Sequence, residues 1–97
     1  MIPVAVHGAE GRMGVLVTAL VDGADGVDLA GLVTEPGKGR GAGEFHPHVP
    51  LIGQDDMATA LPAGCVVVDF SLAAALDGLL EQVGALGAPL VTGTTGF

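Results

Sequence analysis

Three glycines at a spacing of three residues constrain the fold of this chain more than any other feature. Gly8, Gly11 and Gly14 follow a short apolar run that ends at His7. Beyond them, apolar residues recur with the i, i+3, i+4, i+7, i+8 spacing of a helix that buries one face. These residues are Met13, Leu16, Val17, Leu20 and Val21. The pattern predicts a strand over residues 2–7, a tight turn, and a helix over residues 12–21.

A turn of this kind is suited to a pyrophosphate group. Glycine tolerates positive φ angles and lets the backbone approach a ligand where a Cβ atom would block it. The helix that follows directs unpaired N–H groups and the positive end of its dipole toward the turn. Because the spacing GxxGxxG is less specific than GxGxxG, a turn that only reverses the chain remains the alternative.

Composition narrows the class of protein. Of the 97 residues, 49% are hydrophobic and 14% charged, which favours one small domain with a parallel sheet buried on both faces. The net charge is −8, with only three Lys and Arg residues, so we expect no nucleic-acid partner. No apolar run is long enough to span a membrane. Because the chain has a lone cysteine and leaves no room for a signal peptide before the first strand, we expect a cytoplasmic protein.

The rest of the chain alternates between predicted strands and helices. Strands are expected over residues 27–33, 50–52, 65–70 and 89–91. Helices are expected over residues 55–61 and 71–86, and a glycine-rich loop over residues 36–49. Alternation of this kind indicates parallel βαβ units with right-handed crossovers. We therefore predict an α/β fold, a doubly wound, Rossmann-like parallel sheet of five strands in the order 3-2-1-4-5.

In such a sheet, ligands bind beyond the carboxyl ends of the strands, where the strand order reverses. Residues 8–14, 69–71 and 93–97 should meet there. Glu35 follows the second predicted strand, 21 residues after Gly14, where a carboxylate can accept hydrogen bonds from ribose hydroxyls. The alternative for Glu35 is a solvated loop charge.

Two charged residues lie in or beside the glycine turn. Glu10 would repel phosphates if it pointed inward, so we expect it to point to solvent. Arg12 opens the helix, where a cation opposes the helix dipole. This suggests that Arg12 faces a ligand, although a freely solvated arginine is the alternative.

Other polar residues are given mainly structural roles. Asp69 is expected to be buried and to hold a loop by accepting backbone N–H bonds. His7 is more plausible as a packed side chain than as a cofactor contact. His46 and His48 lack a third ligand, so we expect no metal site. Cys65 should be an inert, buried thiol.

Three motifs together resemble dihydrodipicolinate reductases: GAEGRMG in the turn, VVVDFS in the middle, and GTTGF at residues 93–97. The resemblance covers the whole chain in element order. It implies an NADH- or NADPH-dependent reductase of lysine and diaminopimelate synthesis, which reduces 4-hydroxy-tetrahydrodipicolinate. It also implies which residues contact the cofactor. The pyrophosphate would lie against Gly8, Ala9, Glu10, Gly11, Arg12 and Met13, and the adenosine ribose against Glu35. The nicotinamide side would lie against Phe70, Ser71, Gly93, Thr94 and Thr95.

The resemblance also implies what these residues lack. Members of the family continue beyond GTTGF into a domain with a histidine pair, a catalytic lysine and the sheet of a homotetramer. Residues 1–97 should then form the cofactor-binding domain alone, with no catalytic residue and with the cyclic dicarboxylate substrate bound elsewhere. Such a chain alone should bind cofactor weakly, be inactive, and be unstable or self-associating through its edge strand.

Departures from the family concern cofactor choice. Ser71 replaces a frequent threonine, and Pro36 stands where some members have an arginine for the extra phosphate of NADPH. Because Glu35 should repel that phosphate while Arg12, Lys38 and Arg40 partly offset this repulsion, we expect a modest preference for NADH.

Two alternatives to the reductase function remain open. One is the cofactor domain of a homoserine or aspartate dehydrogenase, and the other is a non-catalytic module that binds a nucleotide or coenzyme A.

Overall fold

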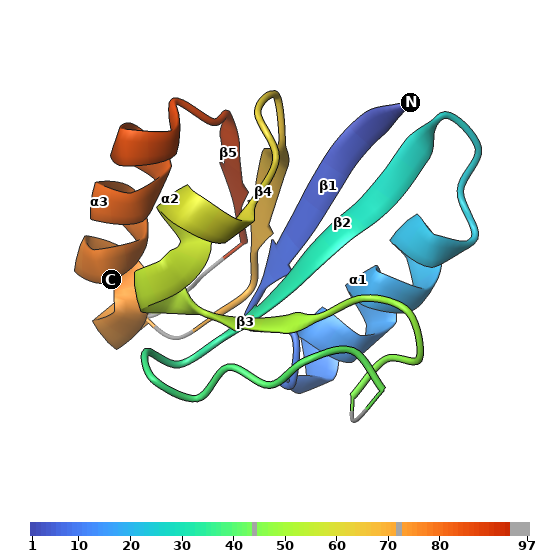
Figure 1. Ribbon diagram of the computed structural model, residues 1–97, viewed down its shortest axis with the longest axis horizontal. Helices are drawn as coiled ribbons and strands as arrows, with labels where there is room; N and C mark the ends of the chain where they lie inside the picture. The colour runs from blue at the N-terminus through green and yellow to red at the C-terminus, as the bar shows by residue number, and fades with distance from the viewer. Residues whose placement is uncertain (44, 72, 94–97) are drawn as a thin grey trace.

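The predicted sheet and its strand order are confirmed. The computed structural model describes residues 1–43, 45–71 and 73–93. Its five parallel strands lie in the order β3-β2-β1-β4-β5 (Figure 1). The strands are β1 (Ile2–His7), β2 (Val27–Thr34), β3 (Leu51–Gly53), β4 (Val66–Asp69) and β5 (Leu90–Thr92). The order reverses between β1 and β4, so the carboxyl ends of these two strands flank the expected binding crevice.

Helices connect the strands as the sequence predicts, with different ends. Helix α1 (Arg12–Asp22) follows the glycine turn. A short 3₁₀ turn η1 (Gln54–Asp56) precedes α2 (Met57–Ala60), and a second, η2 (Ala73–Ala75), precedes α3 (Leu76–Leu86). The predicted helix over residues 71–86 therefore becomes regular only at Leu76. Its end is as expected, because Gly87 adopts a left-handed conformation (φ 69°) that stops the helix.

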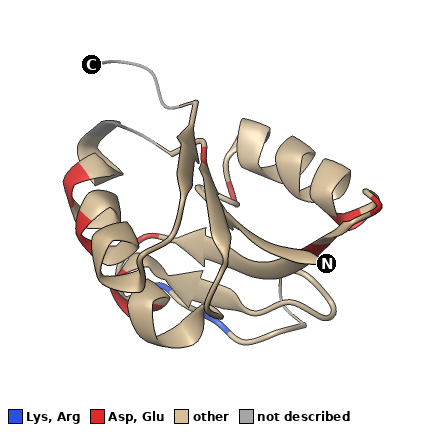
Figure 2. Cartoon of the chain, turned by 90° about the horizontal axis from the view of Figure 1, so that it is seen from above, with Lys and Arg blue, Asp and Glu red and all other residues tan. Residues whose placement is uncertain are grey.

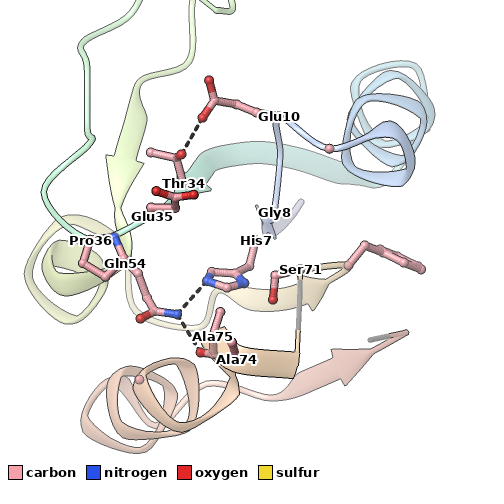
Figure 3. A pocket seen from close by; sticks show the side chains of 13 residues that line it. His7, Gly8, Glu10, Thr34, Glu35, Pro36, Gln54, Ser71, Ala74 and Ala75 are labelled. Atoms are coloured by element: carbon pink, nitrogen blue, oxygen red, sulfur yellow. Dashed lines mark hydrogen bonds between the residues drawn. The ribbon is translucent and has the colours of Figure 1, made fainter. Parts of the chain in front are cut away.

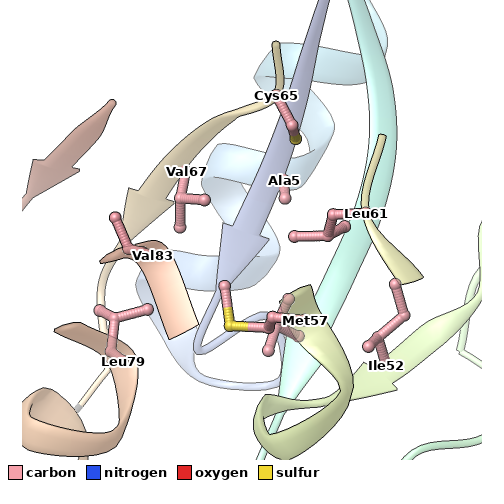
Figure 4. Close-up of a cluster of buried hydrophobic side chains, with 9 residues drawn as sticks. Ala5, Ile52, Met57, Leu61, Cys65, Val67, Leu79 and Val83 are labelled. Atoms are coloured by element: carbon pink, nitrogen blue, oxygen red, sulfur yellow. The ribbon is translucent and has the colours of Figure 1, made fainter. Parts of the chain in front are cut away.

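Two apolar cores cover the two faces of the sheet. Met57 of α2, Leu61 directly after it and Leu79 of α3 pack against one face (Figure 4). On the other face, Val6 and Leu32 are buried with Val17 and Val21 of α1 packed against their cluster. Cys65 is fully buried in the first core, and burial raises the pKa of its thiol. The thiol therefore stays protonated at neutral pH, as expected of an inert cysteine.

The predicted buried face of α1 is only partly correct. Val17 and Val21 are half-buried, but the larger apolar residues Met13, Leu16 and Leu20 are exposed. The residues of α1 that are buried are Gly14 and Thr18. A Cβ atom at Gly14 would lie 2.0 Å from the carbonyl oxygen of Gly8, so a backbone-to-backbone contact sets how the helix sits. This contact turns the small residues inward and leaves much of the apolar stripe outside.

The loop between β2 and β3 is attached to the sheet. The N–H of Arg40 donates to the carbonyl oxygen of Leu51 (2.6 Å), and the N–H of Leu51 donates back to that of Arg40 (2.8 Å). In the part of the chain that the structure describes, no helix combines the length and apolar character needed to cross a membrane.

Candidate functional site

A cavity of about 740 Å³ opens at the carboxyl ends of the strands, where the strand order reverses (Figure 3). It is bounded by the glycine turn, the end of β2, the start of η1, and the segment that leads from β4 into α3. Six residues that the sequence assigned to the site line it: Gly8, Glu10, Gly11, Glu35, Phe70 and Ser71. The topology therefore brings together segments that are far apart in the sequence.

The glycine turn lies close against the segment that follows β4. Gly8 has a positive φ angle of 78°, and a Cβ atom there would lie 2.8 Å from the backbone nitrogen of Ser71. The N–H groups of Gly8 and Ala9 both donate to the carbonyl oxygen of Val33 (3.0 and 3.2 Å), which ties the turn to β2. Only glycine fits this position without moving one of the two segments.

Gly11 is the N-cap residue of α1 and lines the cavity. Within the described residues, no side chain makes a capping hydrogen bond there, and the first turn carries no acidic residue. The first N–H groups of a helix need a partner, and an anion at this place can supply it. The start of α1 therefore has the chemistry of an anion site.

Three predicted residues of the turn lie off the cavity wall. Ala9 is fully buried, whereas Arg12 and Met13 are exposed on α1, and none of the three lines the cavity. Their contact with a cofactor stays a prediction.

A buried polar network forms one side of the cavity. Asp69, at the end of β4, is fully buried, and its Oδ1 accepts from His7 Nδ1 (2.8 Å) and from the N–H of Ser71 (2.9 Å). Its Oδ2 accepts from the hydroxyl of Thr92 (2.8 Å). The predicted structural role of Asp69 is thus confirmed, because the carboxylate joins the ends of β1, β4 and β5.

Gln54 completes this network, although no pattern in the sequence pointed to it. Its amide nitrogen donates to His7 Nε2 (2.9 Å) and to the carbonyl oxygen of Ala75 (2.9 Å) (Figure 3). Because His7 Nε2 accepts, the imidazole carries its proton on Nδ1 and donates it to Asp69. His7 is therefore packed, as expected, yet it also lines the cavity. We call His7, Gln54 and Asp69 the floor network.

The opposite side of the cavity carries a more exposed set of contacts. Glu10 accepts a hydrogen bond from the hydroxyl of Thr34, and its Oε2 accepts one from Arg40 (2.7 Å). The expectation that Glu10 points to solvent is therefore only partly correct, because the residue is exposed and yet lines the cavity and makes both contacts. Its carboxylate turns toward the end of β2, because a hydroxyl and a guanidinium there satisfy both of its oxygens. We call Glu10, Thr34 and Arg40 the rim contacts.

Glu35 lies directly after β2 and lines the same cavity as the glycine turn. Gly93 follows β5, where its N–H donates to the carbonyl oxygen of Asp69 (2.8 Å). Thr94 and Thr95, the other predicted residues of this segment, lie outside the described residues.

Among the described residues, no group of three or more His, Cys, Asp or Glu side chains is arranged to hold a metal. His46 instead pairs with Asp22 (2.9 Å).

Comparison with known proteins gives a consistent result. The family model described as "Dihydrodipicolinate reductase, N-terminus" matches residues 2–97. The 4-hydroxy-tetrahydrodipicolinate reductase of Alkalilimnicola ehrlichii is 40% identical to this chain, over 97% of the chain and 37% of the relative. The protein of the same name from an Anaeromyxobacter species is 41% identical, over 100% of the chain and 37% of the relative. The chain therefore spans a little over a third of the length of these relatives.

Proposed function

This chain belongs to the dihydrodipicolinate reductase family, and we propose that its residues 1–97 bind the nicotinamide dinucleotide of a 4-hydroxy-tetrahydrodipicolinate reductase in lysine and diaminopimelate synthesis. The observation that carries this proposal is the shared cavity of the glycine turn and Glu35 at the reversal of strand order. The names of the relatives supply the reaction.

The residues present fit a dinucleotide. The uncapped start of α1 suits a pyrophosphate, and Gly8 and Gly11 line the cavity beside it with backbone that carries no side chain. Glu35 lies on the same cavity wall, at the end of β2, where its carboxylate would accept hydrogen bonds from the two ribose hydroxyls. Bound NADH or NADPH would supply a hydride to the cyclic dicarboxylate substrate.

The side chains of residues 1–97 bind and orient in this proposal. The floor network holds the ends of β1, β4 and β5 together beneath the cavity, and Phe70 and Ser71 form the wall toward the nicotinamide side. We assign no proton transfer to substrate to any of these residues. The homotetramer implied by the family resemblance stays a prediction.

Binding measurements on the Glu35→Ala variant test this function. In the unmodified protein we expect NADH to bind more tightly than NADPH, because Glu35 bonds the ribose hydroxyls and repels a 2′-phosphate. The variant should lose NADH affinity by about 5–30-fold, as for one charged hydrogen bond, and keep or improve its NADPH affinity. Calorimetric titration with both dinucleotides measures the change.

Asp28→Ala is the matched control, because Asp28 is an exposed carboxylate near the opposite end of the same strand. It should leave both affinities unchanged. Titration with coenzyme A tests the alternative of a non-catalytic module. If coenzyme A binds and neither dinucleotide does, the proposed function is overturned. If Glu35→Ala weakens both dinucleotides equally, the role given to Glu35 is wrong.

A further inference from the structure

Two of the three basic residues of this acidic chain lie beside Glu35. Lys38 and Arg40 line a second cavity of about 460 Å³, which shares Glu10, Thr34 and Glu35 with the main cavity. Elsewhere acidic residues predominate, as on α3 and the turn after α1 (Figure 2). Cations are therefore concentrated where the ribose of the proposed dinucleotide would lie.

The backbone that carries these cations is held in place. Two hydrogen bonds join Arg40 to Leu51 at the start of β3. The N–H of Gly37 donates to Asp55 Oδ1 (2.9 Å), and that of Lys38 donates to the carbonyl oxygen of Glu35 (3.1 Å). Any change of partner at Arg40 would then involve its side chain and not a movement of the loop.

Glu10 bridges the two cavities and neutralises part of this cluster. Its carboxylate lines both cavities and contacts Arg40 at 2.7 Å, while the Thr34 hydroxyl bonds its other oxygen. Glu10 and Glu35 together balance the charges of Lys38 and Arg40. A group with two negative charges would gain little from this cavity as long as Glu10 remains paired with Arg40.

On the basis of the proposed function, we propose that Glu10 is a selectivity residue that disfavours a 2′-phosphorylated dinucleotide. Arginine recognises phosphate through its planar set of N–H donors, and Glu10 occupies donors of Arg40 that a 2′-phosphate would use. A dinucleotide with free ribose hydroxyls does not need these donors, because Glu35 accepts from the hydroxyls. Glu10 thus acts on cofactor choice through Arg40, in addition to the direct repulsion by Glu35.

Glu10→Gln tests this role, because it removes the charge and keeps an oxygen for Thr34. Dissociation constants for NADH, NADPH, 5′-AMP and 2′,5′-ADP should be measured at low and high salt. We expect Glu10→Gln to tighten NADPH and 2′,5′-ADP by about 3–10-fold at low salt and less at high salt, as for a screened ion pair. NADH and 5′-AMP also carry phosphates that would meet one negative charge fewer, but they should tighten less because they lack the group that Arg40 would bind, so the ratio of NADPH to NADH affinity should rise.

Two further variants separate this mechanism from a general charge effect. Adding Arg40→Gln to Glu10→Gln should abolish the rise in the ratio of NADPH to NADH affinity. Glu81→Gln, which removes an exposed carboxylate on α3 outside both cavities, should give no gain. A rise in the ratio of NADPH to NADH affinity that persists without Arg40, an equal rise in Glu81→Gln, or an unchanged ratio in Glu10→Gln would each overturn the proposal.

The outcome also separates this proposal from the proposed function. If NADH binds and its binding depends on Glu35 while Glu10→Gln changes nothing, only the role of Glu10 is wrong. If the unmodified protein binds neither dinucleotide, the proposed function is overturned and the role of Glu10 with it. Circular dichroism melts of all variants confirm that the comparison is made between folded proteins.

Discussion

The floor network and the rim contacts both contribute residues to the wall of the main cavity, but they differ in how far their charged side chains are exposed to water. In the floor, His7, Asp69 and Gln54 are 3%, 0% and 5% exposed. On the rim, the side chains of Arg40 and Glu10 are 49% and 40% exposed. A buried polar group that loses its partner costs about 1–3 kcal/mol, whereas an exposed ion pair is worth about 0–1 kcal/mol. Burial, and not contact distance, therefore decides which set stabilises the fold.

The two sets also differ in what they connect. The floor joins the ends of three strands to η1 and to the carbonyl oxygen of Ala75 in η2. The rim joins the glycine turn to the end of β2 and to the following loop. Loss of the floor should therefore disturb the sheet ends on which the site is built. Loss of the rim should change only which charges a ligand meets.

The largest effect is expected from Asp69→Ala. This change leaves the buried imidazole of His7 without its acceptor and removes one acceptor from the Ser71 N–H and the Thr92 hydroxyl, so the free energy of unfolding should fall by about 3–5 kcal/mol. Asp69→Asn keeps the shape and one acceptor oxygen and should cost less. Urea unfolding followed by circular dichroism measures both. A loss below about 1 kcal/mol for Asp69→Ala would show that the floor does not stabilise the fold.

The glycine turn allows a test in which stability and binding separate. A Cβ atom at Gly14 would lie 2.0 Å from the Gly8 carbonyl oxygen, whereas one at Gly11 would lie 3.4 Å from the same atom. Gly14→Ala should therefore lower the free energy of unfolding by about 1–3 kcal/mol through overpacking, and Gly11→Ala by much less. Gly11 lines the cavity and Gly14 does not, so Gly11→Ala should still weaken NADH binding. Equal losses of stability in the two variants would contradict the role given to Gly14.

Gln54→Leu tests whether the floor extends beyond the carboxylate. The change removes the donor to His7 Nε2 and to the Ala75 carbonyl oxygen, and we expect a loss of about 1–3 kcal/mol in urea unfolding. Gln82→Leu is the matched control, because Gln82 is only half-buried and accepts from the N–H of Ala58. If both variants lose the same stability, burial is not what distinguishes the floor.

Features that depend on local pattern could be predicted from the sequence. The strands, their order and the glycine turn follow from apolar runs, alternation and residue spacing, and the buried role of Asp69 follows from the three valines before it. The same reasoning identified the cavity residues that directly follow the strands, such as Glu35 and Ser71.

Features that depend on tertiary contact could not be predicted. Gln54 meets His7 across 47 positions, and Arg40 meets Glu10 across 30, separations at which no periodicity carries information. The prediction of which face of α1 is buried failed for a related reason. Its apolar stripe predicted one buried face, but the backbone contact between Gly14 and Gly8 determined another. Such contacts become visible only once both partners have been placed.

The smallest effect on stability is expected at the rim. A double-mutant cycle with Glu10→Ala and Arg40→Ala should give a coupling of about 0.2–1 kcal/mol at low salt, because both side chains are well exposed. The coupling should fall further in about 1 M salt, where the Debye length is near 3 Å. Urea unfolding of the four proteins at both salt concentrations measures it. A coupling above about 2 kcal/mol that salt does not reduce would place the rim with the floor as a structural element. Arg40 would then not be available to a phosphate, and the selectivity role proposed for Glu10 would be wrong.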